Sequence, residues 1–264
     1  MKIDLITIFP EFFRGPLEHG IVNRAQKAGL VEIAIRDLRE FTHDRHRTVD
    51  DRPFGGGEGM VLKPDPIFEC LEAMHVPARG ERENERVLVL SPQGKLFDQR
   101  MAQEFSKLDR LVLISGRYEG IDERVSEFLA DGEVSVGDFV LSGGELAAAI
   151  IVDAVARLLP GALGNADSAR QESFTAVEKE LGEGPDSTCG SGGLLDYPHY
   201  TRPAEFRGHV VPEVLQNGNH DEIRRWRRQR ALEKTFRNRP DLLQGAELSK
   251  EDCKFLASLR EEKV

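Results

Sequence analysis

The chain has 264 residues, a formal net charge of −10, 39% hydrophobic residues and 31% charged residues, which is typical of a globular protein with a sizeable core. It contains no run of about 18 apolar residues, which excludes a membrane-spanning helix, and its acidic balance argues against nonspecific binding to a polyanion such as DNA. The three scattered cysteines Cys70, Cys189 and Cys253 indicate a reducing compartment without a disulfide framework or zinc site, so we expect a cytoplasmic protein.

The first quarter of the chain predicts two strands, two helices and one long polar loop. Residues 3–9 and 31–35 have strand-like apolar patterns, and residues 11–29 and 64–74 are expected to be helical. Residues 41–60 have no sustained periodicity and are rich in Arg, His, Asp and Gly. Long irregular loops inside compact domains are usually functional, so this segment is expected to contact a ligand.

The middle of the chain alternates short apolar strands with helices. Strands are predicted at 86–90, 111–115 and 133–136, with helices beginning at Asp98 and Asp122. This alternation predicts an α/β domain with a mostly parallel sheet. Glycine-bearing polar loops follow the three strands, and ligands of open α/β sheets bind outside the carboxyl ends of the strands. The three loops are therefore predicted to form one ligand pocket.

The last of these loops, residues 135–145, reads S-V-G-D-F-V-L-S-G-G-E and leads into an apolar helix predicted at 146–159. Its glycines permit close approach of a ligand to the main chain, although a tight turn into a core helix explains the same pattern equally well. The chain lacks both G-x-x-x-x-G-K-[ST] and a G-x-G-x-x-G after its first strand, which disfavours an α/β nucleotide hydrolase or a dinucleotide-binding protein.

The composition changes after residue 164. Residues 165–193 are acidic and rich in Gly and Ser, as in a flexible linker, and residues 197–203 form a proline-punctuated segment. The chain is then mainly helical, and residues 224–239 hold eight basic residues against the single acid Glu233. Such a run is either a solvated helical surface or a phosphate-binding face.

Six motifs occur in an order that resembles a known family. They are H-D-R-H-R-T-V-D-D-R-P-F-G-G-G-E-G-M at 43–60, L-S-P-Q-G at 90–94, S-G-R-Y-E-G-I-D-E-R at 115–124, S-V-G-D-F-V-L-S-G-G-E at 135–145, L-D-Y-P-H-Y-T-R-P at 195–203 and G-N-H-D-E-I-R-R-W-R at 218–227. Together they closely resemble the bacterial tRNA (guanine-37-N1)-methyltransferases of the SPOUT superfamily. His43 and His46 lack a convincing third ligand, so we expect hydrogen-bonded loop chemistry there rather than a metal site.

The resemblance implies a homodimer whose amino-terminal domain, residues 1–164, contains a deep trefoil knot that binds S-adenosylmethionine. Residues 165–195 would be a flexible linker, and residues 196–264 a small all-α domain that helps to bind the tRNA anticodon stem-loop. The expected cofactor-binding residues are Ser91, Pro92, Gly116, Tyr118, Glu119, Gly120, Ser135, Val136, Gly137, Phe139, Leu141, Gly143 and Gly144. The expected RNA-binding residues are His46, Arg52, Gly56, Gly57, Gly59, Arg202, Arg224, Arg225 and Arg227.

Methylation of guanine N1 requires removal of the N1 proton by a base, and a cation near O6 would stabilise the charge that develops there. The resemblance assigns the cation to Arg157 and the base to Glu172, at a position where the family usually has Asp. We expect Asp196 to shape the site from the second domain, and Asp167 or Asp196 to be the alternative base. The resemblance also implies a use of Mg²⁺, which Glu119, Glu172 and Asp196 could bind.

Two other functions fit part of this pattern. One is a SPOUT methyltransferase that modifies another RNA atom, such as a ribose 2′-hydroxyl, although such an enzyme would not need a loop that clamps a guanine edge. The other is a tRNA-binding relative that has lost its catalytic base, which only the replacement of Asp by Glu172 favours. Methyl transfer to a transcript with guanosine 37 distinguishes these possibilities.

Overall fold

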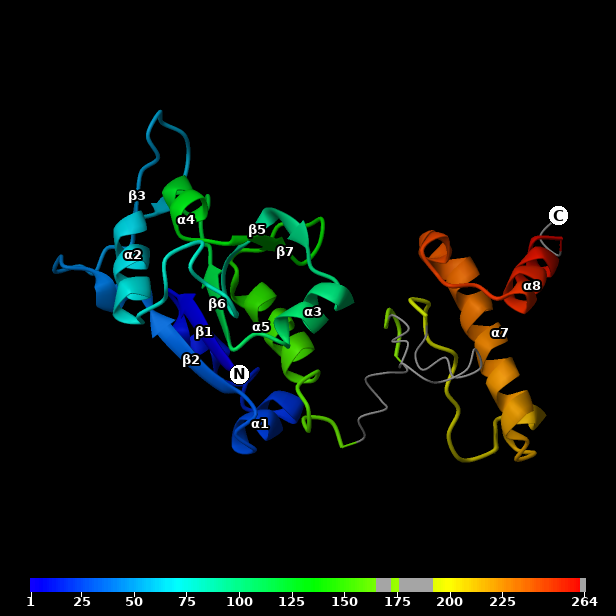
Figure 1. Cartoon of the computed structure of the whole chain (residues 1–264). Helices are drawn as coiled ribbons and strands as arrows, with labels where there is room; N and C mark the ends of the chain where they lie inside the picture. The colour runs from blue at the N-terminus through cyan, green and yellow to red at the C-terminus, as the bar shows by residue number, and fades with distance from the viewer. Residues whose placement is uncertain (165–171, 176–191, 262–264) are drawn as a thin grey trace. The chain divides into compact units, whose positions relative to one another are not determined.

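The computed structural model describes residues 1–164, 172–175 and 192–261. The chain divides into two compact units, Met1–Gly164 and Asn165–Val264, which are coloured blue to green and green to red in Figure 1. Each unit is described separately below. The alternative base Asp167 and most of the expected linker lie outside the described residues.

The first unit is built on a five-stranded sheet in the order β2-β1-β6-β5-β7, and all of its strand pairs are parallel. The prediction of an α/β unit with a parallel sheet is therefore confirmed. The strands are β1 (Lys2–Thr7), β2 (Glu32–Asp37), β5 (Glu85–Leu96), β6 (Arg110–Ser115) and β7 (Gly132–Ser135).

Alternate residues of the central strands pack into two separate hydrophobic clusters, because successive side chains of a strand point to opposite faces of the sheet. Leu111 and Leu113 contribute to the cluster that also contains residues of α1 (Gly20–Lys27), α3 (Gln99–Phe105) and α5 (Glu145–Ala156). Val112 and Ile114 contribute to the cluster of α2 (Pro64–Ala73) and α4 (Glu123–Phe128). The two layers of helices explain why these strands are apolar on both faces.

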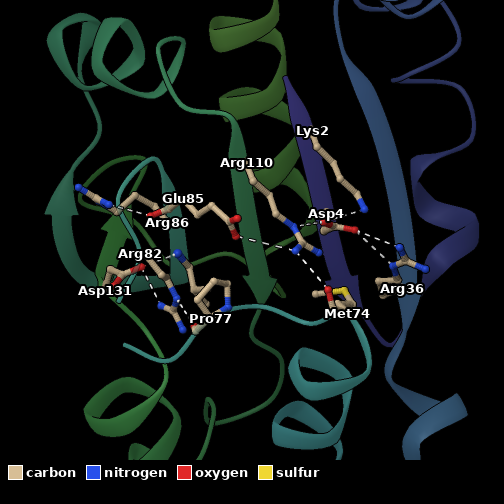
Figure 2. A network of polar contacts seen from close by, with 11 residues as sticks. Lys2, Asp4, Arg36, Met74, Pro77, Arg82, Glu85, Arg86, Arg110 and Asp131 are labelled. Carbon is tan, nitrogen blue, oxygen red and sulfur yellow. Dashed lines mark hydrogen bonds and ion pairs between the residues drawn. The ribbon is translucent and has the colours of Figure 1, made fainter. Parts of the chain in front are cut away.

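A charged network lies at the amino-terminal end of β1 and β6 (Figure 2). Its centre is the fully buried Asp4, whose carboxylate accepts hydrogen bonds from Arg110 Nε at 2.8 Å and from Arg36 Nε and Nη2 at 3.3 Å. Arg110 Nη1 also donates to the Met74 carbonyl at the end of α2, at 3.2 Å. A buried carboxylate requires such partners, and these contacts join strands β1, β2 and β6 to the end of α2.

The prediction of a helix over residues 11–29 is wrong for the first half of this segment. A short 3₁₀ helix (η1, Pro10–Phe13) is followed by a turn, and α1 begins only at Gly20. Gly15 has a φ of 88° and precedes a proline, so the backbone cannot continue as a helix there. The loop predicted at 41–60 follows a second 3₁₀ helix (η2, Leu38–Phe41). It contains the short strand β3 (Asp50–Asp51), which pairs antiparallel with β4 (Val61–Leu62) directly after the loop.

The second unit is mainly helical but departs from the all-α expectation. Its helices are α7 (His220–Asn238) and α8 (Lys250–Glu261), accompanied by the 3₁₀ helices η3 (Glu213–Leu215) and η4 (Pro240–Gln244). Leu194, Leu232 and Leu256 form its small core. Strands β8 (Glu205–Phe206) and β9 (His209–Val210) form an antiparallel hairpin. Its turn residues Arg207 and Gly208 both have positive φ, as two-residue hairpin turns require.

Side chains near their amino-terminal ends stabilise both long helices of this unit. Asn219 Oδ1 accepts the N–H groups of Asp221 and Glu222 at the start of α7. Ser249 and Asp252 accept each other's backbone N–H at 3.1 and 2.9 Å, which is the reciprocal capping box of α8. Among the residues that the structure describes, none of the helices combines the length and apolar character needed to cross a bilayer.

Candidate functional site

Residues 91–93 of β5, where its pairing with β7 is interrupted between Leu90 and Lys95, and the loops that follow β6 and β7 enclose a cavity of about 370 Å³. The strand predicted at 86–90 therefore continues to Leu96, through the segment that was expected to be a loop. Because the strands are parallel, their carboxyl ends lie at one edge of the sheet, where the sequence predicts a shared pocket. Every residue expected to bind the cofactor lines this cavity: Ser91, Pro92, Gly116, Tyr118, Glu119, Gly120, Ser135, Val136, Gly137, Phe139, Leu141, Gly143 and Gly144. The structure thus brings together three segments that are spread over residues 91–144 of the sequence.

Two glycines allow the loop before α5 to lie directly against the loop after β6. A Cβ on Gly143 would lie 2.0 Å from Arg117 Nε, and one on Gly144 would lie 2.8 Å from the Ser115 Cα. The Gly144 N–H donates to the Gly116 carbonyl at 2.9 Å. These positions therefore need glycine for close packing of the cavity wall, in addition to any approach of a ligand.

A buried ion pair behind the cavity was missed by the sequence analysis. Glu145 is fully buried and accepts hydrogen bonds from Arg117 Nε at 2.9 Å and from Thr7 Oγ1 at 2.7 Å. Arg117 also donates from Nη1 to the Ser142 carbonyl at 3.1 Å, and its guanidinium lies over the Phe9 ring. Arg117 stands inside the G-R-Y-E-G motif, and Glu145 is a carboxylate at the start of an apolar helix. An unexplained charge before an apolar run is the signal that could have identified this pair.

The loop after β6 is bonded to the end of the long polar loop. Glu119 N–H donates to the Met60 carbonyl and Leu62 N–H donates to the Gly120 carbonyl, both at 3.0 Å. A Cβ on Gly59 would lie 2.6 Å from the Glu119 side chain. Tyr118, between these contacts, has a φ of 60° and an exposed side chain. The cavity wall and the loop that is expected to bind RNA therefore form one connected structure.

The expected RNA-binding residues of the first unit are all exposed in this loop: His46, Arg52, Gly56, Gly57 and Gly59. The loop is shaped by Asp44, whose carboxylate accepts the N–H groups of His46 and Thr48, both at 2.8 Å. The hydrogen bond from the Thr48 backbone holds the pKa of Asp44 below its usual value. His43 contacts Glu69, with 2.8 Å between Nε2 and Oε2.

The residues expected to carry out the chemistry are distributed over both units. Arg157 is the half-buried residue that ends α5, in the first unit. In the second unit, Glu172 begins a short turn that is bonded to residues 193–196. Ser173 Oγ accepts the Asp196 N–H at 2.9 Å, and Phe174 N–H donates to the Leu194 carbonyl at 2.9 Å. These bonds bring the main chain beside Glu172 together with the main chain of Asp196, whose carboxylate contacts His199 Nε2 at 2.8 Å.

The four arginines of the second unit that are expected to bind RNA are exposed, and three of them interact with other side chains. Arg224 pairs with Asp221, and Arg225 Nε lies 3.4 Å from Glu251 Oε1. The Arg227 guanidinium lies 4.8 Å from the centroid of the Tyr197 ring. Arg202 precedes Pro203 in an exposed segment. Within the described parts of the chain, no group of three or more His, Cys, Asp or Glu residues is arranged to hold a metal ion.

The sequence matches a protein-family model described as "tRNA (Guanine-1)-methyltransferase TrmD" over residues 1–245. A protein of Koribacter versatilis (strain Ellin345) is 86% identical over 260 residues, which cover 98% of both chains. A protein of Geobacter metallireducens is 50% identical over 261 residues, and one of Dictyoglomus turgidum is 49% identical over 262 residues; each match covers 99% of this chain and 98% of the relative. All three relatives are named tRNA (guanine-N(1)-)-methyltransferase.

Proposed function

The chain belongs to the tRNA (guanine-1)-methyltransferase family and is an enzyme that methylates guanine N1 in tRNA, and we propose that its methyl donor is S-adenosylmethionine and its target is guanosine 37. The observation that carries this proposal is the glycine-lined cavity formed by residues 91–93 of β5 and the loops after β6 and β7. The enzyme would act in the cytoplasm, where tRNA is the available substrate.

The cavity suits a nucleoside-sized methyl donor. Its volume of about 370 Å³ lies in the range of small-ligand sites. Main-chain groups of residues 91–93 in β5 and of the loops at 116–120 and 135–144 would bind the adenosine part, and Tyr118 and Glu119 would face the methionine part or the target base. S-adenosylmethionine supplies an electrophilic methyl group on its sulfonium. The chain's own residues must then position the guanine and remove its proton.

Proton removal is assigned to Glu172. The neutral N1 of guanine carries a hydrogen and has no free lone pair, so a carboxylate within hydrogen-bond reach must accept that proton as the N1–methyl bond forms. Arg157 would donate to O6, where negative charge develops. Asp196 would help to position the base, which is supported by the bond between its N–H and Ser173 Oγ, directly after Glu172.

Two surfaces are assigned to the RNA. The loop 43–60 would hold the extruded guanine, and Arg202, Arg224, Arg225 and Arg227 of the second unit would contact the phosphates of the anticodon stem-loop. Enzymes that modify a base must expose it from its stack, and proteins usually read RNA through bases in single-stranded loops. The exposure of these residues supports this assignment.

The SPOUT-type knot and the homodimer are also part of the proposal. The path of the chain after β7 supports a knot: β7 pairs with β5 at the edge of the sheet, and the next segment returns across β5 to the end of β6, where Gly144 bonds to Gly116. The α5 helix supports a dimer, because Leu146 and Ile150 on one of its faces are 49% and 48% exposed. Large apolar side chains one turn apart on a helix are typical of a surface that another chain covers.

A bound Mg²⁺ is not assigned to a protein site. Among the described residues, no group of three or more His, Cys, Asp or Glu is arranged to hold a metal ion.

Product analysis tests the proposed function. A tRNA transcript with guanosine 37 is incubated with the enzyme and S-adenosylmethionine, digested, and examined by mass spectrometry against 1-methylguanosine and 2′-O-methylguanosine standards. The proposal predicts 1-methylguanosine at position 37 and no product from an adenosine-37 transcript. A ribose-methylated product, or 1-methylguanosine at another position, would overturn it.

A further inference from the structure

Phe54 is the most exposed large apolar side chain described in either unit. Its exposed fraction is 100%, and it stands in the loop between β3 and β4, which projects from the first unit at the top of Figure 1. A phenylalanine in this position contributes nothing to the core. Its ring has a free face that is available to another molecule.

The loop that carries Phe54 is attached to the wall of the cavity. Beyond the Glu119 and Gly120 contacts described above, the Asp122 N–H donates to the Leu62 carbonyl at 3.0 Å, and Leu62 forms a bridge with Ile121. Residues 116–121 all line the cavity. Phe54 is therefore held by a segment that is bonded directly to the site of methyl transfer.

The backbone beside Phe54 has the conformation of a defined turn. Gly56 N–H donates to the Pro53 carbonyl at 3.3 Å, and Gly55 and Gly56 have φ values of 84° and 79°. A Cβ on either glycine would meet nothing within 4 Å, so these glycines serve the backbone angles and not close packing. Pro53 on one side and the left-handed glycines on the other hold Phe54 at the tip of the loop.

The chemistry around the tip fits RNA. Arg52 is exposed beside Pro53, and no carboxylate occurs between Arg52 and Gly57. The enzyme acts on a base in tRNA, so single-stranded nucleotides must pass the mouth of the cavity. Exposed aromatic rings next to a cation are the usual stacking platforms for unpaired bases. A second copy of this chain would instead be expected to cover a wider apolar patch than one ring.

We propose that Phe54 stacks on an unpaired base next to the target guanine, and so fixes the register of the RNA loop while the guanine lies beside the methyl donor. This inference rests on the proposed function. It adds a substrate-positioning contact that none of the expected RNA-binding residues provides, because those are cations, a histidine and glycines.

Methylation kinetics with Phe54→Ala, Phe54→Leu and Phe54→Trp test the proposal, with Phe128→Ala as the matched control. Phe128 is 61% exposed at the end of α4 and does not line the cavity. Loss of stacking predicts that kcat/KM for the tRNA transcript falls about 10-fold to 100-fold in Phe54→Ala. Phe54→Leu should fall nearly as far, Phe54→Trp should retain wild-type activity, and Phe128→Ala should be unchanged.

Three further readouts separate stacking from other roles. The affinity for S-adenosylmethionine, measured by calorimetry, and the sedimentation coefficient should be the same in all of these variants. A transcript with 2-aminopurine on either side of guanosine 37 should change its fluorescence on binding the wild type, and the change at one of these positions should be lost in Phe54→Ala.

Several results would overturn the inference. Near-normal kcat/KM in Phe54→Ala, or full activity in Phe54→Leu, would exclude stacking. An equal loss of S-adenosylmethionine affinity would assign Phe54 to the cavity, and a change in sedimentation would assign it to contact between copies of the chain. If the wild type does not methylate guanosine 37, the proposed function fails. If the wild type methylates guanosine 37 and the Phe54 variants do so equally well, only this inference fails.

Discussion

The Arg117 guanidinium donates a hydrogen bond of 2.9 Å from Nε to Glu145 Oε2, and its Nη2 lies 2.9 Å from the same oxygen, which joins the loop after β6 to the first turn of α5. Glu145 is buried, and Thr7 at the end of β1 completes its hydrogen bonding. One carboxylate thus joins the end of β1, the loop after β6 and the start of α5, and only the last two of these segments contribute residues to the cavity wall.

Replacing Glu145 with Gln should weaken S-adenosylmethionine binding by about 10-fold, because the loss of one charge-assisted hydrogen bond loosens the loop at 142–144. The free energy of unfolding should fall by about 3 kcal/mol, since Arg117 is left without its counter-charge. Calorimetric titration and urea unfolding measure the two effects. The control is Glu104→Gln on the exposed side of α3, and equal affinities in both variants would contradict this account.

Gly143→Ala should disrupt the cavity, because the new Cβ would lie 2.0 Å from Arg117 Nε and force the ion pair apart. We expect a loss of S-adenosylmethionine affinity of at least the size expected for Glu145→Gln. Gly132→Ala in β7 is the matched control, since a Cβ there meets nothing within 4 Å. If both alanine variants bind the donor as the wild type does, the close packing of this loop has no role in binding.

The second unit should lose stability in acid through Asp252. Burial raises the pKa of Asp252, but the hydrogen bonds from Arg228 and from the Ser249 backbone outweigh burial and leave the pKa below its usual value. A lowered folded-state pKa means that the carboxylate stabilises the fold above its unfolded pKa of about 3.9, and that this contribution is lost as the pH falls through the folded pKa.

Asp252→Asn should therefore lower the stability of this unit by about 1–3 kcal/mol at pH 7, and the difference from the wild type should shrink below about pH 4. Trp226, the one tryptophan of the sequence, lies in α7 and reports unfolding by its fluorescence. A stability difference that stays constant between pH 7 and pH 3.5 would mean that the ionised carboxylate is not what stabilises α8.

Cys70 should be inert in the native protein. It is fully buried, and burial raises the pKa of its thiol to about 12, so almost no thiolate exists near pH 8. Cys253 is exposed and should react at an ordinary rate. Alkylation followed by peptide mass mapping checks this, with labelling in denaturant as the control. Rapid native labelling of Cys70 would indicate that the α2 layer opens.

Much of the fold and the cavity could be predicted because their signals are local. Three apolar runs, each followed by a glycine-bearing polar segment, are sufficient to place these segments together at one edge of a parallel sheet. The end of the first strand was predicted wrongly, because β5 continues to Leu96 after an interruption of its pairing with β7. The Arg117–Glu145 pair could not be predicted in this way, because its members are 28 positions apart and pair only after β7 and the glycine loop have folded.

Two local features were also missed. Gly15–Pro16 interrupts the helix that was predicted over residues 11–29. The β8–β9 hairpin consists of two-residue strands, which are too short to have a periodic signal.

Single-turnover methylation of a guanosine-37 transcript by Glu172→Gln and Glu172→Asp tests the central claim most directly. The account predicts that Glu172→Gln loses about 100-fold or more of the rate, because it cannot accept the N1 proton, while Glu172→Asp retains much of it and both variants bind S-adenosylmethionine normally. A near-normal rate in Glu172→Gln would contradict the account and transfer the role of the base to Asp196 or Asp167.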